Sequence, residues 1–409
     1  MYAVQVPRRF TQTEWGGTET AILASSRELA ARGHRVEVFT SMALARRPRD
    51  SLAGIGIRRF RHVYPYAGLT AAEVDAMDRK GGNLVSAGLM RALLAEPGVD
   101  LFHAHSAKRL GGMVRTAARL RGVPYVVSLH GGWFDLPPQS RSDLARPYQG
   151  RPEWGKALGW LLGSRRVLSD AAAVLCVGHN ELRLARQALP DVRVELMPNG
   201  VDTARFAAGD ALRFRQRHGI PPGRRILLNV GRIDPQKNQL ALLEALSLLL
   251  PDLPDLHVVL IGGITDPAYH ERLVARVGAL SLQDRVTVIP GLAPDDPSLV
   301  DAYHTASVFC LPSVHEPFGI VVLEAWAAGL PAVVARVGGL TGLTTEGRDA
   351  LQVDPDQPEQ LARALSSVLQ SPGLSSRLSA NGRATATGTY DWRVIGLRLE
   401  RLYAEVARH

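Results

Sequence analysis

The sequence predicts an α/β protein with two doubly wound, Rossmann-like domains, and three observations carry this prediction. Short runs rich in Val, Ile and Leu alternate with helical patterns along all 409 residues. Such alternation is typical of parallel sheets that are covered by helices on both faces. The pattern restarts near Arg224, and two domains of about 200 residues suit a chain of this length. We therefore expect two sheets of about six strands rather than one large sheet.

The expected strands are short apolar runs that end at turn residues. In the first half they are residues 2–6, 35–40, 55–60, 99–106, 125–131, 171–178 and 194–200. In the second half they are residues 225–231, 257–263, 286–291, 307–313, 331–339 and 350–354. Between them, segments such as 18–33 and 239–250 carry apolar residues at helical spacing, so each strand is expected to lead into a helix.

The domain boundary is expected within residues 197–206. Pro198 and the Asn199–Gly200 pair interrupt regular structure there and permit a turn between the two sheets. The chain then divides into an N-terminal, acceptor-side domain (1–200), a C-terminal, nucleotide-sugar-binding domain (201–388) and a C-terminal helix (389–409). We expect this last helix, which is amphipathic, to pack back on the first domain.

Composition excludes several classes of protein. The chain is 46% hydrophobic and 21% charged, unlike a disordered protein. No run reaches the roughly 18 apolar residues of a membrane-spanning helix, and no secretory leader is visible. Cys176 and Cys310 lie in strand-like runs whose spacing suits neither a zinc site nor a disulfide framework, so we expect two buried thiols. These features favour a cytoplasmic protein.

The positive charge is concentrated in the first half. Residues 1–200 hold 28 basic and 17 acidic side chains, a net charge of +11, whereas residues 201–409 have a net charge of −2. A basic first half suits nucleic acid, an anionic membrane surface or an anionic substrate. We find no zinc-finger spacing and no RNP-like aromatic motif, so no nucleic-acid partner is expected.

Two basic residues follow the first strand of the second half. Arg232 and Lys237 are five positions apart in the loop GRIDPQKNQ, between a strand that ends at Gly231 and a helix that begins near Asn238. In open α/β sheets, ligands bind beyond the carboxyl ends of strands, where helices present free N–H groups. A guanidinium forks onto phosphate oxygens and an ammonium adds a mobile charge. The pair therefore predicts a diphosphate clamp, with two solvated loop cations as the alternative.

Two glutamates flank the start of a later helix, in HEPFGIVVLEAWAAGLP. Glu316 lies before a helix that is expected to start near residues 318–320, and Glu324 lies eight positions further on. The helix is otherwise nearly all apolar, so a carboxylate on it needs a partner. Free N–H groups of residues 319–322 would form an anion site between the two carboxylates, which accept hydrogen bonds from sugar hydroxyls. This arrangement suits a ligand with a central phosphate and hydroxyls at both ends.

These motifs together resemble the retaining glycosyltransferases of family 4. The resemblance rests on GRIDPQKNQ, on HEPFGIVVLEAWAAGLP, on MPNGVD, on GGTE at residues 16–19 and on SLHGG at residues 128–132. The motifs occur in the family's order and span nearly the whole chain. The resemblance implies the GT-B architecture, in which two Rossmann-like domains face a central cleft.

The resemblance also implies a role for each matching residue at the donor site. Arg232 and Lys237 would bind the diphosphate of the donor and offset the charge on the departing nucleotide. Glu316 would contact the sugar near its reacting face and His130 would lie under the sugar, so these four are the expected catalytic residues. Glu324 would hold the ribose hydroxyls. The remaining donor contacts would come from Gly16, Gly17, Gly291, Leu292, Phe318, Gly319 and Ile320.

The reaction that the resemblance implies is transfer of a hexosyl unit from a nucleotide-diphosphate sugar to an acceptor hydroxyl, with retention of anomeric configuration. UDP is the family's commonest nucleotide. The leaving phosphate would accept the acceptor's proton, so no protein base, metal or cofactor is expected besides the nucleotide sugar. The acceptor stays open among glycans, lipid-linked sugars and small molecules. The basic first half favours an anionic or membrane-proximal acceptor, as in cell-envelope or polysaccharide biosynthesis.

The expected acceptor-side residues each have a structural alternative. His103 and His105 alternate on one strand, and burial alone explains them as well as an acceptor role does. Lys108 and Arg109 follow that strand and would either meet an anionic acceptor or face solvent.

The segment 154–168 is amphipathic and carries Arg165 and Arg166. It suits an ordinary packed helix with a basic edge, or peripheral contact with the inner face of an anionic membrane.

Other functions remain open on the same scaffold. A sugar-nucleotide epimerase or a phosphorylase would share the fold, although the intact clamp argues against both. A catalytically silent sugar- or membrane-binding protein would have lost a clamp residue, and none is lost. No strand is followed by the GxGxxG motif of nicotinamide-dependent oxidoreductases. The D-x-D sequence at 354–356 contains proline and follows a strand, so it indicates a solvated turn rather than a metal site.

Overall fold

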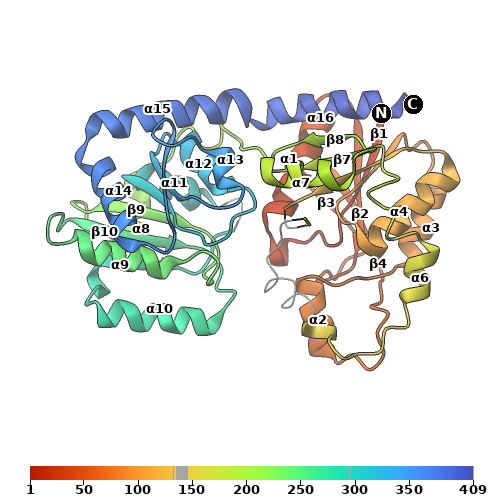
Figure 1. Cartoon of the computed structure of the whole chain (residues 1–409), viewed down its shortest axis with the longest axis horizontal. Helices are drawn as coiled ribbons and strands as arrows, with labels where there is room; N and C mark the ends of the chain where they lie inside the picture. The colour runs from red at the N-terminus through yellow and green to blue at the C-terminus, as the bar shows by residue number, and fades with distance from the viewer. Residues whose placement is uncertain (132, 135–145, 294–295, 409) are drawn as a thin grey trace. The chain divides into compact units, whose positions relative to one another are not determined.

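The structure is a computed structural model that describes residues 1–131, 133–134, 146–293 and 296–408. The chain divides into two compact units, of which the first comprises Met1–Pro198 and Arg393–His409 and the second comprises Asn199–Trp392. Each unit has its own parallel sheet with helices on both faces (Figure 1). The predicted fold class is confirmed.

The first unit contains an eight-stranded sheet in the order β3-β4-β2-β1-β5-β6-β7-β8. All neighbouring strands are parallel except β3 and β4, which form an antiparallel pair. The strands are β1 (Tyr2–Val6), β2 (Arg35–Ser41), β3 (Arg49–Leu52), β4 (Ile55–Phe60), β5 (Leu101–Ala104), β6 (Tyr125–Leu129), β7 (Ala173–Cys176) and β8 (Val194–Leu196).

The second unit contains a six-stranded, fully parallel sheet in the order β11-β10-β9-β12-β13-β14. Its strands are β9 (Arg225–Val230), β10 (Leu256–Ile261), β11 (Val286–Ile289), β12 (Val308–Leu311), β13 (Ala332–Ala335) and β14 (Ala350–Val353). In both sheets the strand order reverses at the first strand, with β1 between β2 and β5 and β9 between β10 and β12. Such reversal points are where open α/β sheets bind ligands.

Every strand expected from the sequence is present, and the structure adds β3. The sequence of β3 is RDSL, which lacks the apolar run used to recognise the other strands. It forms because Ala53 and Gly54, with φ angles of +50° and +82°, make a two-residue turn that leads directly into β4. Two positive φ angles suit the right-handed twist of a hairpin, so local turn geometry creates this edge strand.

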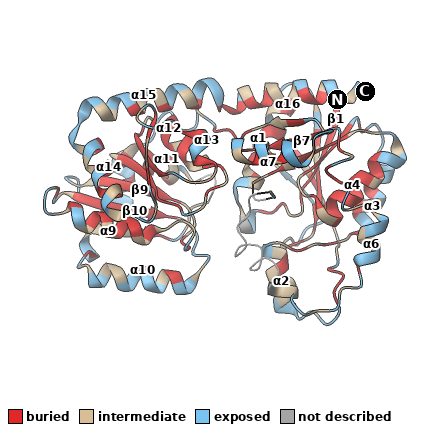
Figure 2. Cartoon of the chain, in the orientation of Figure 1, coloured by how far each residue is buried: buried red, intermediate tan, exposed pale blue. Residues whose placement is uncertain are grey.

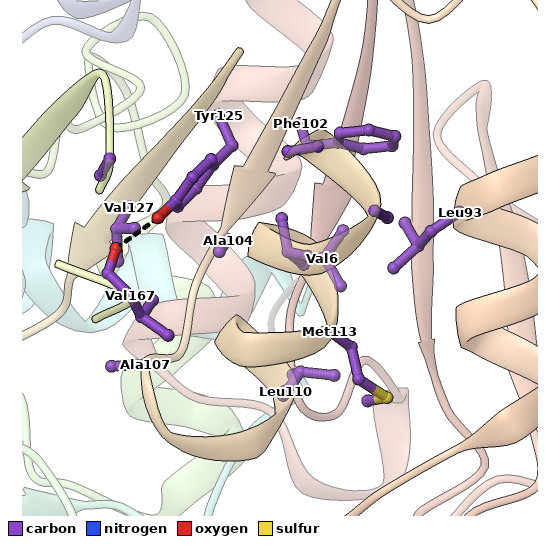
Figure 3. Close-up of a cluster of buried hydrophobic side chains, with 14 of the residues drawn as sticks. Val6, Leu93, Phe102, Ala104, Ala107, Leu110, Met113, Tyr125, Val127 and Val167 are labelled. Carbon is purple, nitrogen blue, oxygen red and sulfur yellow. Dashed lines mark hydrogen bonds between the residues drawn. The ribbon is translucent and has the colours of Figure 1, made fainter. Parts of the chain in front are cut away.

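Helices on both faces of the first sheet enclose its core. They are α1 (Gly17–Ala31), α2 (Ala71–Arg79), α3 (Ala87–Ala95), α4 (Lys108–Arg121), α6 (Lys156–Leu161), α7 (His179–Ala188) and α16 (Trp392–Ala407), with short 3-10 turns η1 (Gln12–Glu14) and η2 (Arg146–Tyr148). One face of the core joins Val6 and Phe102 of the sheet to Leu110 of α4 (Figure 3). The buried Tyr125 hydroxyl donates to the Val167 carbonyl at 2.7 Å, which satisfies its polar end.

The C-terminal helix α16 packs on the opposite face of this sheet. Leu399, Leu402 and Tyr403 of α16 are buried against Ala3 of β1 and Leu101 of β5. The last residues of the chain therefore complete the core of the first unit.

The second unit has the same layered plan. Its helices are α8 (Ala211–His218), α9 (Gln239–Leu249), α10 (Pro267–Ala279), α11 (Pro297–Thr305), α12 (Ile320–Ala327), α13 (Leu340–Leu343), α14 (Pro358–Gln370) and α15 (Pro372–Thr389), with the 3-10 turn η3 (Gln283–Arg285). Apolar residues of α9, α10 and α14 share one cluster with the sheet. In both units the central strands are buried almost throughout, whereas the outer faces of the helices are exposed (Figure 2). Cys176 and Cys310 are both buried, as predicted.

Gly262, directly after β10, is a close-packed point of the second sheet and yields a stability prediction. A Cβ atom at this position would lie 1.8 Å from the Gly231 carbonyl oxygen, whereas one at Gly263 would meet no heavy atom within 4 Å. Gly262→Ala should lower the free energy of unfolding by about 1–3 kcal/mol because the backbone must move to relieve the overlap.

Denaturant unfolding of Gly262→Ala and of Gly263→Ala, each compared with the parent protein, checks this expectation. Equal stability of the two variants would contradict the packing described here.

Candidate functional site

The first half of the candidate site in the second unit is the loop between β9 and α9. Arg232 is held at its tip, where one guanidinium nitrogen lies 3.1 Å from both an Asp234 carboxylate oxygen and the Gln236 side-chain oxygen. Asp234 is itself buried and accepts hydrogen bonds from the Lys237 N–H and from Thr265. These contacts orient the guanidinium while its side chain remains 42% exposed, so it can still meet a ligand.

Lys237 turns inward and pairs with Glu316, which lies in the loop that follows β12. The Lys237 ammonium contacts one Glu316 carboxylate oxygen directly, and both side chains are close to fully buried. The two loops meet because β9 and β12 are parallel neighbours, so their carboxyl ends lie at the same edge of the sheet. The Val314 N–H donates to the Gln236 carbonyl at 2.9 Å and joins the loops further. The structure thus brings together the two residues that the sequence places 79 positions apart.

The loop after β12 also contains polar atoms that bond to no residue in the described part of the chain. Within that part, the Ser313 hydroxyl and the Nε2 atom of His315 are buried without a hydrogen-bond partner. Buried polar atoms are normally satisfied, and exceptions gather at sites where a ligand supplies the partner. These two atoms strengthen the case that the loop is built to bind.

The amino end of α12 lies next in the chain. Gly319 precedes the helix with a φ angle of +101°, a conformation that side-chain-bearing residues rarely adopt. Its carbonyl accepts from the Val322 N–H at 3.0 Å, so that N–H is not free, and the expected anion site narrows to residues 319–321. Phe318 is buried, whereas Ile320 is half-buried at the first position of the helix.

Glu324 lies on the second turn of α12 and forms a hydrogen bond with a tyrosine. One carboxylate oxygen accepts a hydrogen bond of 2.7 Å from the buried Tyr303 hydroxyl on α11. Burial raises the pKa of Glu324 to about 7, although the Tyr303 hydrogen bond and the positive charge of Arg205 both act to lower it. A carboxyl with such a pKa can both donate and accept hydrogen bonds near neutral pH.

Gly291 and Leu292 occupy the loop after β11, at the same edge of the sheet. The Gly291 N–H donates to the Ile289 carbonyl at 2.7 Å, and Gly291 has a φ angle of +96°. Gly291 faces Gly263 of the neighbouring loop closely enough that an added Cβ atom would lie 3.6 Å from the Gly263 nitrogen. Both Gly291 and Leu292 remain half-exposed.

In the first unit, the glycine pair opens α1 directly after the loop that follows β1. Gly16 is the N-cap and Gly17 the first helical residue, and both are exposed. The Gly16 N–H donates to the Glu19 carboxylate at 3.2 Å, and Glu19 also pairs with Arg9. The helix end is therefore exposed, although the Glu19 carboxylate already accepts from the Gly16 N–H.

His130 and His105 lie together at the carboxyl edge of the same sheet. Their Nε2 and Nδ1 atoms are 2.8 Å apart, and the rings stack with centroids 5.0 Å apart. His105 is placed between His130 and His103, whose ring centroid is 4.1 Å from that of His105. Burial lowers the pKa of His130 to about 4 and that of His103 to about 3, so the rings are neutral at neutral pH. Gly132 of the same motif lies outside the described residues.

Lys108 and Arg109 begin α4 and differ sharply in their surroundings. The Arg109 side chain is buried, pairs with Glu153 and donates to the carbonyls of Asn83 and Gly155. These bonds occupy its guanidinium and give it a structural role. Lys108 has a φ angle of +46°, and its ammonium forms no hydrogen bond or ion pair with any described residue.

Burial and the nearby guanidinium groups of Arg8 and Arg109 lower the pKa of Lys108. Of the two basic residues, only Lys108 is therefore available to an anion.

The amphipathic segment 154–168 forms less helix than the sequence indicated. Only Lys156–Leu161 is α-helical, and Gly163 has a φ angle of +59° and ends the pattern before Arg165. Trp160 and Leu161 are 85% and 70% exposed, so they do not form the core-facing side of a packed helix. Contact with an anionic membrane stays a prediction. Among the residues described, no helix has both the length and the hydropathy needed to cross a membrane.

Several residues that contact the candidate site residues were not predicted from the sequence. Asp234 and Gln236 orient Arg232, Tyr303 binds Glu324, and Gln5 and Tyr403 complete the histidine cluster. Asp234 and Gln236 lie inside GRIDPQKNQ, where their polar side chains were a usable signal. The other three carried no signal, because they are far in sequence from the residues they contact. Across the described ranges, no three His, Cys, Asp or Glu side chains are grouped to hold a metal ion.

Comparison with known families supports one interpretation for the whole chain. The family model described as "glycosyl transferase 4-like domain" matches residues 16–200, and the one described as "glycosyl transferases group 1" matches residues 210–385. The D-inositol 3-phosphate glycosyltransferase of Acidothermus cellulolyticus is 33% identical over 384 residues, which cover 89% of this chain and 80% of that protein. The enzyme of the same name from Kribbella flavida is 30% identical over 394 residues, covering 93% and 88%.

Solved structures share the fold at lower identity. Sucrose-phosphate synthase from Thermosynechococcus elongatus has a TM-score of 0.72 at 22% identity, covering 99% of both chains. Anabaena HepE in complex with UDP-glucose has a TM-score of 0.72 at 19% identity, covering 98% of this chain and 99% of that one. At these identities the likeness supports the fold.

The pKa of Glu324 yields a prediction for the unliganded protein. Its ordinary value is near 4.5 and its folded value about 7, so between these pH values the folded state holds a proton that the unfolded state has lost. The free energy of unfolding should therefore fall as pH rises through this window. Glu324→Gln, which is neutral at every pH, should match the parent protein below about pH 4.5 and exceed its stability above about pH 7.

Urea unfolding of both proteins across this pH range provides the measurement. A stability difference that stays constant with pH would show that burial does not raise the pKa of Glu324.

Proposed function

The chain belongs to glycosyltransferase family 4 and is a retaining, nucleotide-sugar-dependent enzyme, and from this premise we propose a specific reaction and specific residues. We propose that it transfers a hexosyl unit from a UDP-sugar to a hydroxyl of an anionic small-molecule acceptor. The observation that carries the donor side is the buried Lys237–Glu316 pair, with Arg232 on the neighbouring loop and the amino end of α12 directly after it. These groups supply two cations, a carboxylate and free N–H groups at one edge of one sheet.

Arg232 and Lys237 would bind the donor diphosphate. Arg232 is oriented by Asp234 and Gln236 while staying exposed, which suits forked contact with phosphate oxygens. Lys237 is held by Glu316 in the unliganded protein, and its ammonium has three donors, so it can contact a phosphate without leaving the carboxylate. The N–H groups at the start of α12 add partial positive charge at the same place.

The two glutamates would bind the two ends of the donor. Glu316, fixed by Lys237, would accept hydrogen bonds from hydroxyls of the sugar. Glu324 is kept in place by Tyr303 and would bind the ribose hydroxyls. Gly291 and Leu292 would contact the base, because the glycine leaves backbone uncovered beside a half-exposed apolar side chain. In the first unit, His130 would bind a sugar hydroxyl and Gly16 and Gly17 the phosphate.

The proposed mechanism follows from where charge develops. Cleavage of the bond between the anomeric carbon and the phosphate oxygen leaves an oxocarbenium-like sugar and a diphosphate that has gained negative charge. Arg232, Lys237 and the helix amino end stabilise that charge more in the transition state than in the ground state, which lowers the barrier. The acceptor hydroxyl attacks the face that the phosphate leaves and gives its proton to a phosphate oxygen. Retention then needs no protein nucleophile and no protein base.

Two findings support the identity of the substrates. UDP as the nucleotide is supported by the shared fold of HepE, whose structures hold UDP and UDP-glucose. An anionic acceptor is supported by the curated relatives, which are named for D-inositol 3-phosphate. It is also supported by Lys108, whose half-buried ammonium pairs with no described residue and feels the positive charge of Arg8. Two neighbouring positive charges of this kind favour a phosphate group on the acceptor. A phosphorylated polyol has both this anion and free hydroxyls to glycosylate.

The donor proposal predicts that Lys237→Ala and Glu316→Ala each lower turnover by at least about tenfold, since each removes a group placed against charge or hydroxyls of the donor. The variants are assayed with UDP-, GDP-, ADP- and TDP-glucose, and thermal shift is measured with each nucleotide sugar. We expect UDP-glucose to stabilise the parent protein and not Lys237→Ala.

Arg363→Ala, which removes an exposed cation of α14, is the matched control and should behave like the parent protein. Near-normal turnover of either site variant would remove that residue from the site. A shift with another nucleotide only would replace UDP as the donor.

The acceptor proposal predicts that the enzyme uses an inositol phosphate and not unphosphorylated inositol. Lys108→Gln should raise KM for the phosphorylated acceptor about tenfold, the effect of losing one hydrogen bond to a charged group, and leave KM for the donor unchanged. Arg46→Gln, which removes an exposed charge of the same unit, should change neither value. Equal use of both acceptors, or an unchanged KM in Lys108→Gln, would contradict the proposal.

A further inference from the structure

A continuous chain of hydrogen bonds crosses the core of the first unit and ends at His130. The Gln5 amide of β1 lies at its centre, with its nitrogen 3.1 Å from the Tyr403 hydroxyl and its oxygen 2.7 Å from His105 Nε2. His105 Nδ1 is 2.8 Å from His130 Nε2. Beyond Tyr403, the chain continues to His103 Nδ1 at 2.5 Å.

His103 Nε2 then bonds to the Ser128 hydroxyl at 2.7 Å, which closes this end of the chain. At the other end, the Nδ1 atom of His130 is buried and has no partner among the described residues. The hydrogen-bond chain therefore has one satisfied end and one end without a partner among the described residues.

The hydrogen bonds of this chain can be donated in only two directions along it. Each neutral imidazole has one donor nitrogen and one acceptor nitrogen, so the state of one ring determines the state of the next. If Gln5 offers its oxygen to His105, then His105 carries its proton on Nε2 and accepts from His130 through Nδ1. His130 then carries its proton on Nε2 and leaves Nδ1 as an acceptor. If the Gln5 amide is turned over, every bond reverses and His130 Nδ1 becomes a donor.

Two observations favour the first direction. The Gln5 amide is oriented with its nitrogen toward Tyr403 and its oxygen toward His105. In the reversed direction, the unpartnered atom at the end of the chain would be a buried N–H group, and orphaned buried N–H groups are rarer than orphaned acceptors. Burial lowers the pKa values of His103, His105 and His130, so the rings stay neutral and each keeps one donor and one acceptor nitrogen.

We propose that Gln5 and Tyr403 are positioning residues that fix the tautomer of His130, so that its Nδ1 atom accepts a hydrogen bond from a substrate hydroxyl. Tyr403 is essential to this arrangement because its hydroxyl can accept from the amide nitrogen or donate to the amide oxygen, so either orientation of Gln5 is satisfied at that end and the unpartnered end at His130 decides the direction. Without the hydroxyl, the first direction leaves the Gln5 amide nitrogen without an acceptor. This cost opposes the preference at His130, and the direction is no longer fixed. Only the identity of the hydroxyl rests on the proposed function.

Tyr403, on which the fixed direction depends, belongs to the C-terminal helix. Tyr403 is 398 positions from Gln5 and 300 from His103, and α16 brings its hydroxyl to the carboxyl half of β1 and β5. The Tyr403 ring is buried in the cluster that holds α16 on the sheet. Tyr403→Phe keeps this ring and removes only the oxygen, so the helix should stay docked.

Histidine tautomers have distinct 15N shifts, which provides a direct test. The protein labelled with 15N at its 12 histidines is compared with the labelled variants Tyr403→Phe and Tyr125→Phe. Tyr125→Phe removes a buried hydroxyl of the same unit that is not part of the hydrogen-bond chain. The signals of His105 and His130 are assigned from His105→Gln and His130→Gln. We expect the Nε2-protonated form of both rings in the parent protein and in Tyr125→Phe, and a mixture of both forms in Tyr403→Phe.

An Nδ1-protonated His130 in the parent protein, or an unchanged tautomer in Tyr403→Phe, would overturn the proposal. Kinetics with UDP-glucose give the second readout. Tyr403→Phe should lower kcat/KM for the donor about tenfold, as expected for one misdirected hydrogen bond, while Tyr125→Phe stays within about twofold of the parent protein. Equal kinetics of the two variants would show that substrate does not use the tautomer. Absence of activity with every nucleotide sugar would refute the proposed function, and the 15N signature would still decide this inference.

Discussion

The parallel pairing of β9 with β12 is the constraint on which the proposed donor site depends. Because these strands run in the same direction and are adjacent, the loops that follow them leave the sheet at one edge. Lys237 on one loop can then pair with Glu316 on the other, and Arg232 lies beside them. The first sheet repeats the arrangement, since β1 and β5 lead into the glycine pair and into His105. The Lys237–Glu316 pair and the glycine pair with His105 thus occur where the strand order of each sheet reverses.

The candidate site in the second unit contains polar groups that add little to the stability of the fold and that a ligand could satisfy. A buried ion pair such as Lys237–Glu316 gains little net stability, because both groups lose their hydration. Ser313 and His315 add buried polar atoms that no described residue satisfies, and burial favours the protonated form of Glu324. In the proposed function, a donor with phosphates and hydroxyls would supply partners to these groups without requiring the loops to be rebuilt. Such preorganisation would lower the barrier, because little reorientation would be needed during the reaction.

Much of the fold and part of the site could be predicted because they depend on local patterns. The strands of both sheets were recognisable as apolar runs, except β3, which a two-residue turn creates in a polar sequence. Arg232, Lys237, Glu316 and Glu324 were recognisable because they interrupt the pattern at strand ends and on an apolar helix. The amphipathic segment near Trp160 was misjudged, since a glycine with positive φ ends its helix early.

The sequence by itself determined the alternation of strands and helices, the placement of polar loops after strands and the positions of the two loop cations, Arg232 and Lys237. These features follow from residue type and spacing over a few turns of chain. Only the tertiary structure decided that Tyr303 binds Glu324, that Arg109 is occupied by Glu153, and that Tyr403 reaches Gln5 across 398 positions. Such contacts depend on which elements become neighbours when the core closes. That choice is made by packing over the whole unit, and no short stretch of sequence records it.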